Sequence, residues 1–139
     1  RQQTPEIYLN PRSWQAFANR PSEPNDDVVE YEPFDNVPLH QYSLEGTWQL
    51  VDEERQVLRD NRGSLHLHFL GSEANLVLGM DDPAVIPHVR VEVDGQFVKE
   101  FDVTRHDLWN LFAGEYGEHE IVLSVTGEGL TGYAFTFGS

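Results

Sequence analysis

The chain has 139 residues, 39% of them hydrophobic and 24% charged, which is the size and composition of one globular domain with its own core. Its formal net charge is −15, and a surface this negative repels nucleic-acid phosphates and anionic lipids. The absence of cysteine excludes disulfides, thiolate nucleophiles and thiolate metal sites. We therefore expect no nucleic-acid partner and no direct membrane contact. No apolar run is long enough for a membrane span, and residues 1–10 lack the apolar core of a signal peptide.

The first 43 residues are typical of an extended strap. Six of the eight prolines lie there, and each fixes φ and removes an amide donor. Residues 21–36 add six carboxylates, which indicates a solvated loop. Aromatic side chains nevertheless recur through this segment, and free linkers are poor in them. We predict that residues 1–43 pack on the main body, with a short helical turn over 13–19 capped by Ser13.

From residue 44 onward, apolar and polar side chains alternate as in strands with one buried face. The segments with this pattern are 47–51, 65–69, 89–93, 121–125 and 133–137. Residues 75–79 are almost continuously apolar and predict a strand covered on both faces. Asp94-Gly95 predicts a two-residue hairpin turn, after which residues 96–103 return antiparallel. Residues 107–118 are predicted to be rich in turns.

About seven strands without a long helix predict an all-β fold. Residues 44–139 are expected to form an antiparallel β-sandwich or jelly roll, with residues 1–43 as its N-terminal strap. The strand order does not follow from the pattern.

Several segments in chain order support a family resemblance. The most specific are TPEIYL at residues 4–9 and YAFTFG at residues 133–138. The others are residues 44–48, 69–79, 89–95, 108–111 and 119–120. Together they resemble the C-terminal domain that follows the thioredoxin-like domain in DipZ-type bacterial redoxin and cytochrome-c-biogenesis proteins. That family usually has tyrosine where Trp109 stands.

The resemblance implies a jelly roll similar to carbohydrate-binding modules, located outside the cytoplasmic membrane. It implies a preceding thioredoxin-like domain in the same polypeptide as a partner. The redox activity does not transfer, because the paired cysteines belong to that preceding domain and this chain has none. No functional residues of the family are carried over to this chain from the resemblance.

His66 and His68 are the first candidates for chemistry. At positions i and i+2 of a strand, both imidazoles point to one face, as two ligands of one metal would. With Glu73 and Gly79 they resemble part of the first metal motif of cupins, which are also jelly rolls, but the second motif is missing. We therefore expect two surface histidines, with no metal and no cofactor, and keep a cupin-like metal-dependent enzyme as an alternative.

Exposed aromatic rings are the second candidates, because sugar rings stack on them. Trp48 lies at the same alternating positions of its strand as apolar residues, so its side chain points to the buried face and is assigned to the core. Trp109 and Tyr116 fall in the segment predicted to be rich in turns, where exposure favours ligand stacking. The alternative for Trp109 is that it closes one end of the sandwich.

Arg90 and Glu92 form a third candidate site with His66 and His68, provided that their strands are neighbours. Such a patch would hold hydroxyl groups or a partner domain, whereas the simpler interpretation is stabilisation of the sheet surface. The sequence thus predicts a non-catalytic binding or docking module for a glycan, a peptide or the neighbouring domain. The second hypothesis is a purely structural domain that orients the redox domain.

Overall fold

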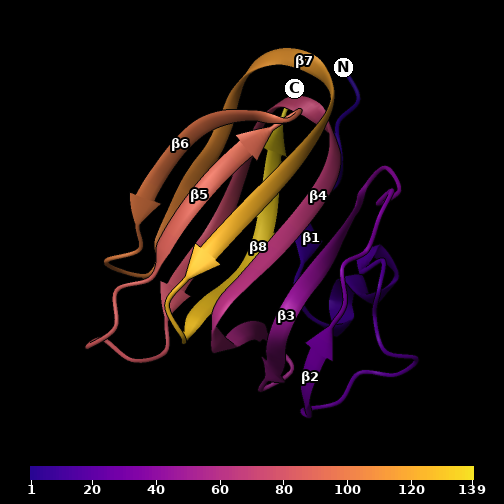
Figure 1. The fold of residues 1–139 in the computed structure, drawn as a ribbon. Coiled ribbons are helices and arrows are strands. Elements are labelled where there is room, and N and C mark those ends of the chain that lie inside the picture. Colours follow the sequence, from indigo (N-terminus) through magenta and orange to yellow (C-terminus); the bar gives the residue numbers. More distant parts are fainter.

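The computed structural model describes all residues 1–139 and is almost entirely β-structure (Figure 1). Its strands are β1 (Ile7–Tyr8), β2 (Val28–Tyr31), β3 (Gln41–Val51), β4 (Arg55–Met80), β5 (His88–Val93), β6 (Gln96–Asp102), β7 (Asp107–Thr126) and β8 (Leu130–Gly138). The one helix is the 3-10 helix η1 (Pro11–Ala16). No helix has both the length and the hydrophobicity needed to cross a membrane.

The strands form two layers that share two long strands. The larger layer has the order β2-β3-β4-β7-β5-β6, and the smaller has the order β1-β8-β4-β7, with every pair antiparallel. Residues 62–71 of β4 pair with 117–126 of β7 in the larger layer, and residues 73–78 pair with 107–113 in the smaller one. Figure 1 shows both strands curving over the top of the molecule. The predicted antiparallel sandwich is confirmed, and its two layers are one continuous hydrogen-bonded sheet folded on itself.

Two predictions are wrong because β4 and β7 bend without ending. Residues 65–69 and 75–79 were expected to be separate strands, and both belong to the 26-residue β4. Residues 107–118 were expected to contain turns, and they are the first half of β7. Register shifts between Gly71 and Glu73 and between Ala74 and Asn75 bend the pair, and such bulges interrupt the alternation of side chains without ending a strand.

The predicted hairpin is present. Asp94 and Gly95 both have positive φ, 51° and 80°, as the central residues of a type I′ turn require. Because of this turn, β6 returns antiparallel to β5 and forms the edge of the larger layer.

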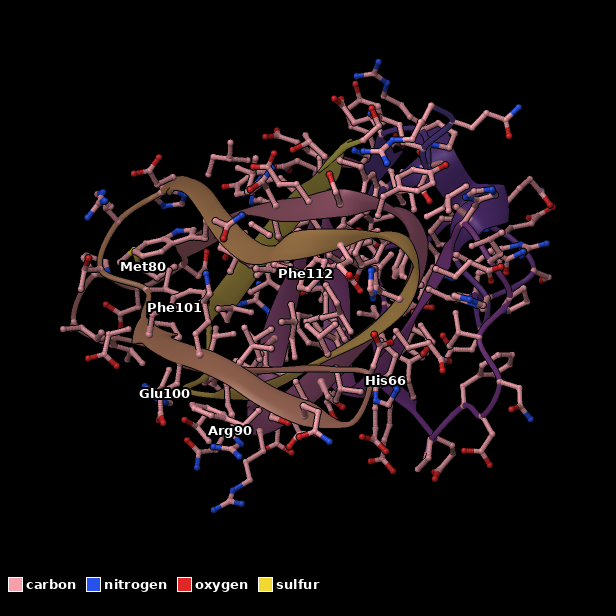
Figure 2. The ribbon with its side chains drawn as sticks, turned by 90° about the horizontal axis from the view of Figure 1, so that it is seen from above. His66, Met80, Arg90, Glu100, Phe101 and Phe112 are labelled. Atoms are coloured by element: carbon pink, nitrogen blue, oxygen red, sulfur yellow. The ribbon has the colours of Figure 1, made fainter.

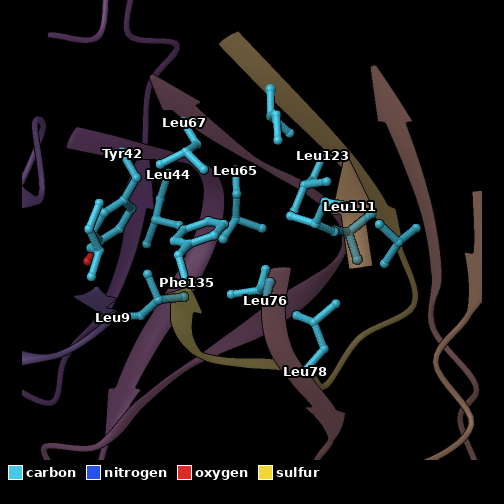
Figure 3. Close-up of a cluster of buried hydrophobic side chains, with 14 of the residues drawn as sticks. Leu9, Tyr42, Leu44, Leu65, Leu67, Leu76, Leu78, Leu111, Leu123 and Phe135 are labelled. Carbon is cyan, nitrogen blue, oxygen red and sulfur yellow. The ribbon is translucent and has the colours of Figure 1, made fainter. Parts of the chain in front are cut away.

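The core is one cluster of 26 buried hydrophobic side chains between the layers. Trp48 is fully buried, as its parity predicted. Four side chains that precede β2 belong to the same cluster: Ile7, Leu9, Trp14 and Phe17. In Figure 3, Leu9 lies beside Phe135 and close to Tyr42. Residues before position 43 therefore cover apolar surface of the sandwich.

Two local predictions for this first segment are wrong in detail. The helical turn is η1, and its N-cap is Asn10, whose side-chain oxygen accepts from the amide of Arg12 at 2.9 Å. Ser13 lies inside η1, and its hydroxyl accepts from the amide of Tyr8 instead. The acidic stretch is not all loop, because β2 lies within it and pairs with β3.

Candidate functional site

The outer surface of the larger layer carries polar side chains in register. Directly paired residues of antiparallel strands point to the same face. His66 of β4 pairs with Ser43 of β3 and with Val122 of β7, and Val122 pairs in turn with Glu92 of β5. These four residues form one row across the sheet, and rows of the same kind lie on either side of it.

Two hollows lie on this surface. The first, of about 240 Å³, has His66, Glu120 and Val122 on its floor; residues 34–37 border it on one side and the Asp94–Gly95 turn on the other. The second, of about 370 Å³, is lined by Glu45, Gly46, Arg62, Gly63, Ser64, Ser124, Val125 and Thr126.

The two hollows adjoin, because each continues the same two strands. His66 and Ser64 are two residues apart on one face of β4, and Val122 and Ser124 are two residues apart on the same face of β7. We call the combined depression, lined by the residues of both hollows, the outer-face groove. It follows β4 and β7 for about six residues, or about 20 Å of extended strand.

The groove contains polar groups that are free to bind. The ring of His66 makes no hydrogen bond, and the carboxylates of Asp35 and Glu120 form no ion pair. The half-buried ring of Phe34 adds an apolar wall next to them. A ligand with hydroxyl or amino groups would find both donors and acceptors here.

His68 has a different role from His66. Its Nδ1 lies 2.9 Å from the carbonyl oxygen of Val37, and its Nε2 lies 3.0 Å from Oε1 of Glu118. Both ring nitrogens are thus engaged, and the first contact holds residues 34–37 over the sheet. No set of three histidine, cysteine or carboxylate side chains is placed to bind a metal ion, so the cupin-like alternative lacks a third ligand.

An ion pair fixes the turn at one end of the groove. Nδ1 of His119 donates to Oδ2 of Asp94 at 2.7 Å, and Nε2 donates to the carbonyl oxygen of Glu115 at 2.7 Å. Both partners are acceptors, so the ring carries both protons. Burial lowers the pKa of His119, but the hydrogen bonds to Asp94 and Glu115 outweigh it and raise the pKa above 6.5. Burial raises the pKa of Asp94, and hydrogen bonds from His119 and the amide of Glu120 bring it below its usual value.

Arg90 and Glu92 do not adjoin the histidines. Their strand, β5, is separated from β4 by β7, so the condition set for a joint patch is not met. The Arg90 guanidinium lies 3.7 Å from the Glu92 carboxylate and stacks over the ring of Phe97. Figure 2 shows His66 and Arg90 apart on the outside of the larger layer. Glu92 shares the row of His66, with Val122 between them.

Trp109 and Tyr116 do not line the groove. The half-buried ring of Trp109 stacks on Phe101, with centroids 4.9 Å apart and planes 5° apart, and the Arg105 guanidinium lies 5.1 Å from its centre. Tyr116 donates its hydroxyl to the carbonyl oxygen of Gln2, and the guanidinium of Arg1 covers its ring. Both aromatic rings are already used by neighbours within the chain.

Sequence reasoning missed most of the groove. The alternation over residues 121–125 signalled which side chains of that strand face outward, so Glu120, Val122 and Ser124 were within its reach. The Asp94-Gly95 turn was recognised only as a turn. No sequence signal placed Phe34 and Asp35 over β4, because that contact joins segments about 30 residues apart.

Comparisons with known proteins agree with the fold. The family described as "Thioredoxin like C-terminal domain" matches residues 4–138. Among curated proteins, no sequence matches this chain. The structure is similar to a family two carbohydrate esterase from Clostridium thermocellum, solved in complex with cellohexaose, with a TM-score of 0.58 and 23% identity over 66% of this chain and 29% of the esterase.

A family two carbohydrate esterase from Cellvibrio japonicus gives a TM-score of 0.53 and 16% identity, over 70% of this chain and 32% of the esterase. At these identities the likeness concerns the fold alone. The chain spans about a third of the length of either esterase.

Proposed function

The chain belongs to the family of thioredoxin-like C-terminal domains, and we propose that it is the non-catalytic accessory domain of an extracytoplasmic, DipZ-type thiol-disulfide oxidoreductase. The family match supports an accessory domain. Because the chain has no cysteine, the thiol chemistry would belong to the preceding thioredoxin-like domain of the same polypeptide.

Within that protein, the domain would act as a binding module, and the outer-face groove is the observation that carries this proposal. A binding site needs a concave surface with a few polar groups that orient the ligand. The groove provides the His66 ring, which makes no hydrogen bond, beside the ring of Phe34, and the hydroxyl of Ser124 further along β7. This combination suits an oligosaccharide, whose hydroxyls form hydrogen bonds while the C–H faces of its rings pack on an aromatic surface.

A glycan array probed with the 139-residue chain tests the binding function. We expect retention of a subset of oligosaccharides, and His66→Ala and Ser124→Ala should weaken it because both remove a groove contact. His88→Ala is the matched control, since His88 binds Glu100 and Asp102 at the edge of the layer, outside the groove. Retention of no glycan, or equal losses in all three variants, would contradict the proposal.

A structural role is the second candidate, favoured by the covered rings of Trp109 and Tyr116. Removing this domain from the parent oxidoreductase separates the two. A binding module should leave reduction of a small soluble disulfide unchanged and abolish retention on the glycan. A domain that orients the redox domain should lower the activity or the melting temperature of the truncated enzyme even without glycan.

A further inference from the structure

Two histidine rings hold the walls of the first hollow of the groove. Residues 34–37 form one wall, and the turn at residues 94–95 forms the other. Nδ1 of His68 lies 2.9 Å from the carbonyl oxygen of Val37 and holds the first wall over the sheet. Nδ1 of His119 lies 2.7 Å from Oδ2 of Asp94 and holds the second. The shape of the hollow therefore depends on both rings.

Each of these rings lies between two hydrogen-bond acceptors. Nε2 of His68 lies 3.0 Å from a carboxylate oxygen of Glu118, and Nε2 of His119 lies 2.7 Å from the carbonyl oxygen of Glu115. A neutral imidazole has one N–H and donates to only one of its two acceptors, whereas the protonated ring donates to both. All four contacts are therefore hydrogen bonds only when both histidines are protonated.

We propose that the first hollow is a pH-dependent binding site, whose two walls are held in place by protonated His68 and protonated His119 and loosen when these rings lose a proton. This inference rests on the proposed function, because it concerns the regulation of ligand binding by the same groove. Histidine is the side chain whose charge ordinarily changes between about pH 5 and pH 8. Ligand binding should therefore be tighter in mildly acidic than in mildly alkaline solution.

Carboxylates surround both rings, and carboxylates ordinarily stay ionised between about pH 5 and pH 8. The charged and titratable groups that face His68 come from β7, the hairpin turn, the first wall and β4: Glu118, Glu120, Asp94, Asp35 and His66. Those that face His119 are Asp94 and Glu115, and its ring otherwise packs on Phe69 and Phe112. His66 makes no hydrogen bond, and the ring of His40 contacts Thr4, so neither ring holds a wall. The pH dependence of the walls is therefore assigned to the two clamped histidines.

Amide hydrogen exchange of the 139-residue chain, followed by NMR at about pH 5.5 and about pH 8, tests the walls without any ligand. The amide of His40 donates to the carbonyl oxygen of His68 and reports the first wall, and the amide of Asp94 donates to the carbonyl oxygen of Glu120 and reports the second. We expect their protection, corrected for the intrinsic exchange rate, to be about three- to tenfold lower at the higher pH, because each wall loses one partly exposed, charged hydrogen bond. The amide of Leu9, which donates to β8 in the smaller layer, should not follow this change.

Single substitutions assign each wall to its histidine. His68→Gln should remove the pH dependence of protection at the amide of His40, and His119→Gln should remove it at the amide of Asp94. His88→Gln is the matched control, because its ring also lies between two carboxylates, each at 2.8 Å, but outside the groove. This control should leave the pH dependence of both amides unchanged.

The glycan array, washed at the same two pH values, connects the walls to binding. We expect uncharged oligosaccharides to be retained about three- to tenfold more strongly at the lower pH, and His68→Gln should flatten this dependence. Equal retention at both pH values, or equal protection of the two wall amides, would overturn the pH inference and leave the binding function standing. Retention of no glycan at either pH would overturn the binding function and the inference with it.

Discussion

His119 combines packing and charge at the end of the groove. Its ring packs against Phe69 and Phe112 at the margin of the core, with centroids 5.6 and 4.6 Å away. Its side chain is only 14% exposed, whereas that of Asp94 is 49% exposed. The ion pair is thus half in water, and it stabilises the fold only while both groups are charged.

The pH dependence of this pair is predictable in sign. Because the pKa of His119 is raised in the folded state, protonated His119 contributes its full stabilisation of the fold below pH 6.5. This stabilisation is lost as the pH rises through the folded-state pKa of His119. Because the pKa of Asp94 is lowered in the folded state, ionised Asp94 stabilises the fold above pH 3.8. This stabilisation is lost as the pH falls through the folded-state pKa of Asp94. Asp94→Asn, which tolerates the same positive φ, should lower the free energy of unfolding by about 0.5–1 kcal/mol near pH 5.

Urea denaturation of both proteins at about pH 5 and about pH 8 measures this difference. We expect it to shrink at the higher pH, because a smaller fraction of His119 is protonated there. A difference of equal size at both pH values would mean that the turn, and not the charge, is affected.

Thr4 is the residue that ties the start of the chain to the bend of β4. It is fully buried; its hydroxyl accepts from the amide of Leu70 at 2.7 Å and lies 2.8 Å from Nδ1 of His40. Thr4→Val keeps the shape but leaves that amide without a partner, which should cost about 1–3 kcal/mol. Denaturant unfolding measures the loss, and Thr4→Ser, which keeps the hydroxyl, should retain most of the stability.

At the scale of elements, the bends of β4 and β7 rest on paired glycines. Gly71 and Gly117 lie opposite each other where the pair leaves the larger layer, and neither has a positive φ. A Cβ on Gly71 would lie 2.7 Å from the carbonyl oxygen of Gly138, whereas a Cβ on Gly117 would meet nothing within 4 Å. The two glycines therefore offer a matched comparison.

Gly71→Ala should destabilise the fold by about 1–3 kcal/mol, because the end of β8 must move. Gly117→Ala should be neutral or stabilising by up to about 1 kcal/mol, since alanine restricts the unfolded chain at no steric cost. Melting temperatures of the two variants provide the test. Equal destabilisation would show that the bend itself requires both glycines.

These glycines also explain what the sequence could predict about the elements. Alternation reports a strand wherever one face is buried, so 65–69, 89–93 and 121–125 were recovered together with the hairpin at Asp94-Gly95. Where a strand passes from one layer to the other, its buried and exposed faces change places, and the alternation of apolar and polar residues breaks as it does at a turn. The sequence pattern therefore divided the long β4 and β7 into shorter segments.

At the scale of the whole molecule, the candidate site depends on which strands are neighbours. Parity placed His66 outward, but it could not show that β7 separates β4 from β5 or that residues 34–37 return over the sheet. Trp109 was placed in a segment predicted to be rich in turns, whereas the ring that stacks on it, Phe101, comes from another strand. Long-range pairing therefore decides the site, and single-sequence patterns do not report it.

The same long-range contacts predict how the molecule unfolds. Phe17, from the segment before β2, is fully buried and stacks on Tyr42 of β3, with centroids 4.8 Å apart and planes 9° apart. Because that segment and the sandwich share one cluster, Phe17→Ala should lower the free energy of unfolding by about 3–5 kcal/mol, as much as a truncation inside the sandwich such as Leu65→Ala.

Far-UV and near-UV circular dichroism should report one coincident transition in both variants. Since a domain is stable by only about 5–15 kcal/mol, Phe17→Leu provides a milder substitution in which the transition can still be followed. If Phe17→Ala lost its near-UV signal before the sheet unfolded, residues 1–43 would be a separately melting attachment. The groove wall at residues 34–37 would then open without loss of the sandwich.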